Sequence, residues 1–289
     1  MNHLEPETCI LCNGKDFKIL FDREFRVLLC RACCLMFVGS IDEVDLEGYY
    51  RKGYYHGIKK NRVDSSSTRL RIQWLSHQMG ALKDKRVLEI GCGQGHLLKA
   101  IQNQGAQVHG IEPSTPDGVL AGSLSGHDNI SICMLSDFQT SMQYDAVVLI
   151  HSFEHISDPV VTLQQIRTLL KPDGCLFIEV PNFFSTTGFY RKRKGVHEYP
   201  SPNHLFIYTP GTLIGILRKS GFENSARGYH FSSMRLVFRP SQNRPASGVS
   251  GSDSYNRVWR FFLLLKVMAG IKNSLYRFLR VFKHRKITR

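Results

Sequence analysis

The sequence predicts an α/β domain built on a largely parallel β-sheet, preceded by a small cysteine-rich module and followed by a basic helical tail. Between residues 85 and 240, short apolar runs typical of buried strands alternate with stretches of helical periodicity. The first 40 residues contain two CxxC pairs. The last 34 residues contain ten Lys or Arg and no Asp or Glu, so the other 255 residues carry only +4 of the net charge of +14. This distribution argues against a nucleic-acid-binding role for the body of the protein.

The cysteine-rich module spans residues 1–40. Cys9 and Cys12 form one CxxC pair, and Cys30 and Cys33 form the second after 17 intervening residues. Two such turns can hold a tetrahedral structural Zn²⁺, because four thiolates leave no open position for catalysis. Buried apolar thiols are the alternative, and Cys34 is either a competing ligand or a spare residue. Metal-binding cysteines, and an N-terminus without the pattern of a signal peptide, predict a cytoplasmic protein.

Four further segments complete the predicted organisation. Residues 41–84 form a polar, tyrosine-rich connector that ends in a helix around Leu70, Trp74 and Leu75. Residues 85–240 form the α/β domain. Residues 241–255 are rich in Ser, Gly and Asn, which predicts a flexible linker, and residues 256–289 form the basic tail.

The predicted sheet is defined by apolar runs bounded by polar or glycine-rich segments. A helix is expected between the fourth and fifth runs, where Val160, Leu163, Ile166, Leu169 and Leu170 recur at helical spacing. The runs predicted as strands are Val87–Ile90, Val108–Ile111, Ile130–Cys133, Ala146–Ile150 and Cys175–Val180, with Met234–Phe238 as the final one.

A glycine-rich loop follows the first strand directly. Gly91, Gly93 and Gly95 occupy alternate positions and lead into an apolar helix pattern. Such a loop lets a ligand approach bare backbone beside a helix N-terminus. Glu112 ends the next strand, 21 residues after Gly91, which is about the distance at which an acidic side chain meets the ribose of an adenosine cofactor. The sequence therefore predicts a nucleoside site, although the glycine spacing differs from the dinucleotide pattern GxGxxG.

Several motifs, in this order, resemble those of the class I S-adenosylmethionine (SAM)-dependent methyltransferases. The loop corresponds to their motif I, and Asn203-His204-Leu205-Phe206 with Gly221-Phe222 is similar to a subgroup that carries an N-terminal zinc ribbon. Members of that subgroup often modify sugars and other small metabolites. The resemblance covers residues 9 to about 238 and implies a Rossmann-like, mostly parallel seven-stranded sheet. The remaining motifs are Gly110-Ile111-Glu112-Pro113-Ser114, the segment Tyr144–Pro159 with Glu154-His155 and Asp158-Pro159, Leu170-Lys171-Pro172-Asp173-Gly174, and Val180-Pro181-Asn182.

The resemblance also implies roles for individual residues in binding SAM. Gly91, Gly93 and Gly95 bring backbone close to the cofactor. Glu89 lies under its methionine moiety, and Glu112 accepts from the ribose hydroxyls. Asp137 is expected to contact the adenine amino group, or else to be a solvated loop carboxylate.

Histidines are the expected catalytic residues. Methyl transfer is an in-line displacement, so the enzyme mostly aligns donor and acceptor, but an oxygen or carbon acceptor must also lose a proton. A histidine is the natural base near neutral pH. His155, His204 and His151 are the candidates in that order, followed by His197. His151-x-x-Glu154-His155 also matches a zinc-peptidase signature, but His151 ends a strand, so the two histidines would not share a helical face.

The acceptor is expected to be an anionic small molecule. The long connection from Pro181 to Tyr208 is rich in Lys, Arg and aromatic residues, which suits a nucleotide-linked sugar or a polysaccharide- or lipid-linked precursor. A solvated basic loop is the alternative. Two other classes of function stay open: an NAD-dependent oxidoreductase, and a non-catalytic adaptor for membrane or nucleic acid.

The tail has the pattern of a basic amphipathic helix. It predicts either peripheral binding to an anionic membrane, at its inner face, or docking against the protein's own body. Its apolar stripe consists of Ile271, Leu275, Phe278, Leu279 and Phe282.

Overall fold

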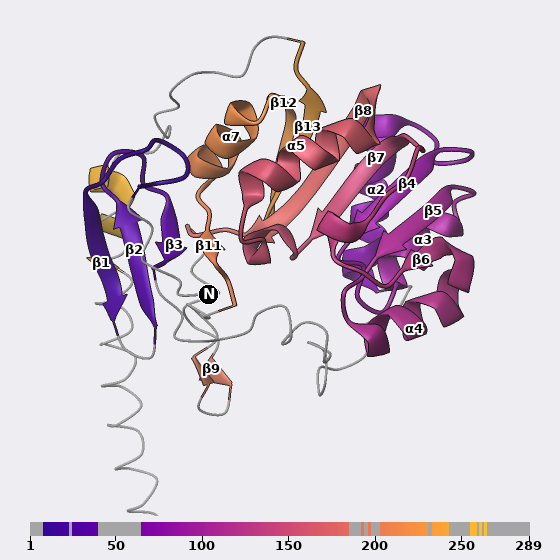
Figure 1. Cartoon of the computed structure of the whole chain (residues 1–289), viewed down its shortest axis with the longest axis horizontal. Helices are drawn as coiled ribbons and strands as arrows, with labels where there is room; N and C mark the ends of the chain where they lie inside the picture. The colour runs from indigo at the N-terminus through magenta and orange to yellow at the C-terminus, as the bar shows by residue number, and fades with distance from the viewer. Residues whose placement is uncertain are drawn as a thin grey trace, which may run out of the picture.

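The computed structural model describes residues 8–22, 25–39, 65–184, 203–227, 233–242, 255–258, 260–261 and 263–264, and the backbone of 192–193, 196–197 and 228–230. Its centre is a seven-stranded sheet of order β12-β13-β8-β7-β4-β5-β6 (Figure 1). Neighbouring strands from β6 to β8 are parallel, and β13 runs antiparallel to both of its neighbours. The mostly parallel seven-stranded sheet is therefore confirmed. The strands are β4 (Arg86–Ile90), β5 (Gln107–Ile111), β6 (Ile130–Ser131), β7 (Tyr144–Ile150), β8 (Leu170–Pro181), β12 (Phe222–His230) and β13 (Ser233–Pro240).

The helices begin where the sequence supplies capping side chains. Ser65 accepts a hydrogen bond from the Thr68 N–H at the start of α2, and Asp158 accepts one from the Val161 N–H at the start of α5. Thr209 caps α7 in the same way. The helices are α2 (Ser66–Met79), α3 (His96–Gln102), α4 (Thr115–Ser125), α5 (Pro159–Leu169) and α7 (Pro210–Lys219), and the 3₁₀ turns are η1 (His127–Asn129), η2 (Leu135–Asp137) and η3 (Phe153–His155).

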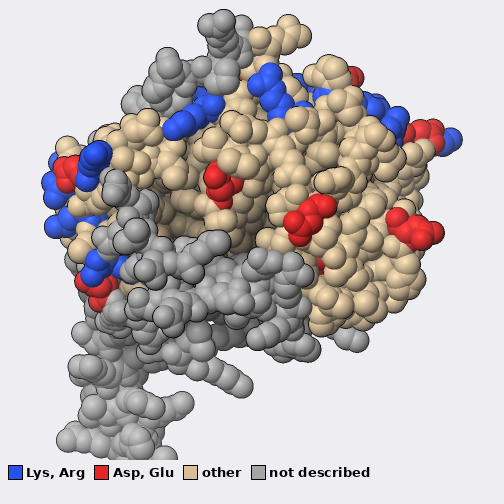
Figure 2. Space-filling model, in the orientation of Figure 1, with Lys and Arg blue, Asp and Glu red and all other residues tan. Residues whose placement is uncertain are grey.

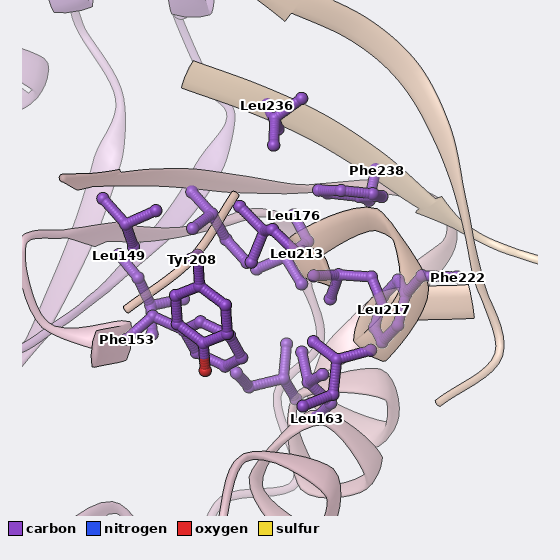
Figure 3. Close-up of a cluster of buried hydrophobic side chains, with 14 of the residues drawn as sticks. Leu149, Phe153, Leu163, Leu176, Tyr208, Leu213, Leu217, Phe222, Leu236 and Phe238 are labelled. Atoms are coloured by element: carbon purple, nitrogen blue, oxygen red, sulfur yellow. The ribbon is translucent and has the colours of Figure 1, made fainter. Parts of the chain in front are cut away.

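Alternation along the strands divides the core into two layers. Val87 of β4 packs with Leu75 of α2 and Leu98 of α3 on one face. The next residue, Leu88, belongs to the opposite cluster with α5 and α7. Figure 3 shows part of this second cluster, in which Leu163, Leu213 and Leu217 from the helices meet Leu149, Leu176, Leu236 and Phe238 from the sheet. Both faces are thus covered, as a parallel sheet requires.

A smaller sheet joins the N-terminal module to the domain. Its order is β1-β2-β3-β11, from β1 (Phe17–Asp22), β2 (Arg26–Cys30), β3 (Met36–Val38) and β11 (Phe206–Ile207). The fourth strand comes from a segment more than 160 residues after β3, and Phe206 pairs with Phe37 (Figure 1). A separate two-stranded ladder joins β9 (Lys192–Arg193) to β10 (Val196–His197).

Three details differ from the sequence prediction. Leu170 does not continue α5; it begins β8 and pairs with Tyr144, so its assignment to the helix was wrong. β6 stops at Ser131, earlier than predicted. β12 was not predicted at all, because this edge strand has few apolar residues and a register shift between Asn224 and Ala226.

The described start of the tail packs against the small sheet. Val258 is fully buried in a cluster with Leu29 and Met36, and the Phe261 ring lies 5.5 Å from the Phe183 ring. The apolar stripe predicted from Ile271 to Phe282 lies outside the described residues, as do residues 41–64 of the connector and residues 243–254 of the linker. Within the part of the chain that is described, no helix has the length and apolar character needed to cross a membrane.

Candidate active site

The residues predicted for the site lie at the carboxyl edge of the large sheet. The parallel strands β4, β5, β7 and β8 all end at this edge. The strand order reverses at β4, because β5 lies on one side of it and β7 on the other. Ligands of open α/β sheets bind in the crevice outside such a point. The glycine loop follows β4, Glu112 follows β5, and His151 follows β7. Figure 2 shows a hollow in one face of the molecule, and the described Lys and Arg side chains lie mostly along the outer edge of that view.

The glycine loop needs glycine at its ends. Gly91 and Gly95 have φ of 73° and 76°, in the left-handed region. A Cβ on Gly95 would lie 2.9 Å from the Cα of Ala121, and one on Gly91 would lie 2.8 Å from the Cβ of Ser152. The loop is therefore packed tightly against α4 on one side and against the segment after β7 on the other.

Glu112 organises this loop. Its carboxylate accepts hydrogen bonds from the Gly93 N–H at 2.7 Å and from the Ser114 N–H at 2.9 Å. Burial raises the pKa of Glu112, while these two N–H groups act in the opposite direction. Each carboxylate oxygen has a second lone pair, so Glu112 can hold the loop and still accept a ribose hydroxyl.

Glu89 is a buried carboxyl group with one oxygen that lacks a partner. Its Oε2 has no hydrogen bond within the described residues, and burial raises its pKa to about 8, although the Arg71 charge opposes the shift. A buried acceptor without a donor needs one from a ligand. The methionine ammonium of SAM would supply it, so this residue fits the predicted cofactor. Asp137 is exposed at the end of η2, where it accepts a hydrogen bond from the Ser136 hydroxyl.

His151 lies between two buried carboxylates. Its φ is 52°, and its N–H donates to the Glu179 carbonyl at 2.8 Å. The ring nitrogens lie 3.5 Å from Glu154 Oε1 and 3.4 Å from Glu179 Oε1. Burial disfavours the charged ring, but Glu154 and Glu179 outweigh burial and raise the pKa of His151 to about 9. His151 is therefore a cation at neutral pH.

Glu179 is the centre of an ion-pair network that the sequence prediction missed. Arg71 binds it through two hydrogen bonds of 2.9 Å, Arg235 donates at 2.8 Å, and the Ser233 hydroxyl donates at 3.2 Å. Burial acts against its charge, but Arg71 and His151 hold its pKa far below the ordinary value. The available signal was a single glutamate inside the apolar strand Cys175–Val180.

His155 and His204 meet beside Glu154, although 48 residues separate the two segments. Their ring centroids lie 4.8 Å apart, and His155 Nδ1 lies 2.6 Å from the Asn203 carbonyl oxygen. Glu154 is buried, and neither of its carboxylate oxygens has a hydrogen-bond partner among the described residues. One nitrogen of each ring and one oxygen of Glu154 lie within 4.8 Å of one another. Burial lowers the pKa of His204 to about 4, so its ring is neutral.

The structure thus brings the first three predicted catalytic residues into one cluster. The fourth candidate, His197, lies in β10, where only the backbone is described.

The four predicted zinc ligands also come together. Cys9 Sγ lies 3.5 Å from Cys33 Sγ, Cys12 Sγ lies 3.5 Å from Cys30 Sγ, and all four sulfurs lie within 4.8 Å of one another. A tetrahedral site with metal–sulfur bonds of about 2.3 Å requires sulfurs roughly 3.8 Å apart, so the cluster fits such an ion. Cys34 is not in this group; it is buried in the cluster that contains Val258.

Comparisons with known proteins identify the family of the chain. Residues 68–226 match a family described as "Methyltransferase domain". The chain is 32% identical over 192 residues to the ubiquinone biosynthesis O-methyltransferase of Bordetella bronchiseptica, covering 60% of this chain and 77% of that protein. It is 30% identical over 181 residues to the protein of the same name from Acinetobacter baumannii, covering 56% and 74%.

The fold is shared with a solved 1,6-didemethyltoxoflavin-N1-methyltransferase of Burkholderia thailandensis. The TM-score is 0.54 at 16% identity, and the match covers 77% of this chain and 98% of that one. The fold and the site define a SAM-dependent methyltransferase. The chain belongs to the class I methyltransferase family. The oxidoreductase and adaptor alternatives are not favoured.

Proposed function

We propose that this enzyme transfers the methyl group of SAM to an oxygen atom of a small-molecule acceptor, with His155 as the general base. The hydrogen bond between His155 Nδ1 and the Asn203 carbonyl carries this proposal. A carbonyl oxygen only accepts, so Nδ1 carries the proton of the neutral ring and Nε2 carries the lone pair. An oxygen acceptor is favoured because the matching relatives are named O-methyltransferases.

Cofactor binding in this proposal follows the predicted residues. The backbone of Gly91, Gly93 and Gly95 cradles SAM, and Glu89 receives its ammonium group. Glu112 accepts from the ribose, and Asp137 accepts from the adenine amino group. Bound SAM supplies an electrophilic methyl group on a sulfonium.

In this proposal His155, Glu154 and His151 have different roles in the reaction. The acceptor oxygen forms a bond to the methyl carbon while the carbon–sulfur bond breaks, and the acceptor proton passes to His155 Nε2. Glu154 stabilises the resulting imidazolium, because its carboxylate lies in the same cluster and, although burial acts against its charge, its contact with the His151 cation lowers its pKa. His151 is already protonated, so in this proposal it attracts an anionic group of the acceptor and does not act as the base.

The proposal also includes the chemical class of the acceptor. The basic and aromatic connection between Pro181 and Tyr208 favours an anionic, ring-bearing compound. A hydroxylated ring compound is our first candidate, and a nucleotide-linked sugar or a lipid- or polysaccharide-linked precursor is the second.

We also infer that Cys9, Cys12, Cys30 and Cys33 hold a structural zinc ion, that the tail contacts the inner face of a membrane, and that the protein is cytoplasmic.

The test uses purified full-length protein and SAM with a deuterated methyl group. Two acceptor panels, ring hydroxyls and nucleotide sugars, are compared by mass spectrometry for the labelled methyl product. His155→Asn keeps a donor near the position of Nδ1 and removes Nε2. His155→Gln places its amide near the position of Nε2 and removes Nδ1. We expect both variants to bind SAM normally and His155→Asn to lose roughly a hundredfold or more in kcat, as for a lost general base. Full activity of His155→Asn, or methylation only at nitrogen or carbon, would overturn the proposal.

A further inference from the structure

The segment 203–208 connects the N-terminal module to the histidine cluster. On one side, the Val38 N–H donates to the Leu205 carbonyl at 2.9 Å, and β11 pairs with β3. On the other side, the Asn203 carbonyl accepts from His155, and the Tyr208 carbonyl accepts from the Phe183 N–H at 3.1 Å. Hydrogen bonds thus hold this short segment along both of its edges.

Aromatic rings follow the same route. Phe37 of β3 pairs with Phe206 of β11, whose ring stacks on Tyr208 with centroids 6.0 Å apart. Tyr208 in turn stacks on Phe153 at 5.5 Å, and Phe153 immediately precedes Glu154 and His155. In Figure 3 the Tyr208 and Phe153 rings lie face to face. Close-packed interiors transmit displacements, so a shift of β3 reaches η3 along this stack.

Two of the four clustered cysteines lie at the turn that leads to β3. Cys30 ends β2, and Cys33 lies in the turn that leads to β3. Within that turn the Cys30 N–H donates to the Leu35 carbonyl, and the Cys34 N–H donates to the Cys30 carbonyl, both at 2.9 Å. The opposite pair, Cys9 and Cys12, comes from a separate turn, so an ion bound by all four sulfurs fixes the β2–β3 turn from both sides.

We propose that the four-cysteine module is a positioning element for the histidine cluster, acting through the strand pair β3·β11 on the segment that carries Asn203 and His204. In this view the module forms a wall of the acceptor site and takes no part in cofactor binding. The inference rests on the proposed role of His155, and it adds that the module controls how the His155 and His204 rings are held.

The experiment compares Val38→Pro with Val38→Ala in the full chain. Proline removes the N–H that donates to Leu205, whereas alanine trims the side chain and keeps the N–H. Amide hydrogen exchange is measured for residues 203–208, with and without chelation of the metal. The tautomer of the His155 ring is read from its ¹⁵N shifts, and S-adenosylhomocysteine affinity is measured by calorimetry.

We expect exchange in 203–208 to accelerate roughly fivefold to tenfold in Val38→Pro, the loss typical of one hydrogen bond, and in the chelated wild type. Nε2–H and Nδ1–H forms of His155 should then mix, while affinity for S-adenosylhomocysteine stays within about twofold of the wild type, as for an uncoupled site. If Val38→Pro does not fold, the chelated wild type gives the same readouts.

Unchanged exchange in 203–208 after chelation, or an unchanged His155 tautomer, overturns the inference. A fully active His155→Asn would instead defeat the proposed function and leave the exchange result standing.

Discussion

Arg71 of α2 binds Glu179 of β8 through two hydrogen bonds of 2.9 Å, although 108 residues separate them in the chain. Both side chains are largely buried, with 16% and 2% exposed. The pair ties the connector helix to the carboxyl edge of the sheet, next to His151. Because a planar guanidinium matches a carboxylate bidentately, a lysine cannot reproduce this contact.

Breaking this pair should destabilise the fold strongly. Glu179→Gln leaves Arg71 and Arg235 without their counter-charge, and removing one partner of a buried pair costs about 3–5 kcal/mol. We expect that decrease in the free energy of unfolding by urea denaturation. The exposed pair of Arg26 and Asp22 provides the control, since Asp22→Asn should change stability by less than about 1 kcal/mol. Equal effects would contradict the assigned role of Glu179.

Acid should unfold the protein through the same carboxylate. The folded-state pKa of Glu179 lies far below its ordinary value of 4.5, so its contribution is present above that value and is lost as pH falls toward the folded pKa. We therefore expect the free energy of unfolding to decrease from about pH 4.5 downward, and this decrease to be smaller in Glu179→Gln. Parallel pH profiles of the two proteins would exclude Glu179 as the source.

SAM binding should release a proton from Glu89. The pKa of Glu89 is raised to about 8, so the group is mostly protonated at pH 7 and must ionise to pair with the cofactor ammonium. Affinity should then rise as the pH increases from 6 to 8 and level off above it. Calorimetry in two buffers of different ionisation enthalpy gives the number of protons released. In Glu89→Gln we expect weaker binding without this pH dependence; an identical profile would show that another group titrates.

Gly95 combines backbone strain with crowding. Its φ of 76° and ψ of 15° are left-handed, and a Cβ there would meet the backbone of α4 at 2.9 Å. Gly95→Ala should therefore cost clearly more in urea denaturation than the roughly 1–2 kcal/mol of a left-handed conformation alone, and it should weaken SAM binding. Gly80, with nothing within 4 Å of an added Cβ but with ψ of −152°, tests backbone strain without crowding, and Gly80→Ala should cost about 1–3 kcal/mol and leave SAM binding unchanged. A loss of only about 1–2 kcal/mol in Gly95→Ala would mean that α4 gives way without cost.

The tail makes a separate prediction. Residues 265–289 contain eight Lys or Arg and no acidic residue. Because Val258 and Phe261 are packed in the body, a truncation after residue 264 preserves that packing. We expect the full chain to sediment with anionic vesicles at low salt and the truncated chain to remain in solution, since each basic residue near the surface contributes about 1 kcal/mol. Equal binding by the two chains would contradict membrane contact through the tail.

Local patterns predicted most of the sheet and the glycine loop. The loop could be recognised because its glycines and Glu112 are set by backbone geometry within one βαβ unit. Glu179 could not be interpreted in the same way, since its partners Arg71 and Arg235 lie far away in the chain. Leu170 was assigned to a helix because its spacing suits both structures, and only its pairing with Tyr144 decides between them.

The strand pair β3·β11 could not be predicted from the sequence either. β11 is two residues long, so it has no periodicity to detect, and its role depends on the edge that β3 offers. The histidines were predicted as candidates one by one. That His155 and His204 lie side by side follows from this strand pair, because it holds the segment 203–208 against η3.

The order of synthesis gives the four-stranded sheet a further consequence. Residue 38 leaves the ribosome long before residue 206, so β3 presents an unpaired edge for most of translation. Exposed edges of this kind recruit other strands and favour aggregation. The first forty residues therefore complete their sheet only after β4 to β8 of the central domain have been made, and an excised N-terminal fragment should be prone to self-association.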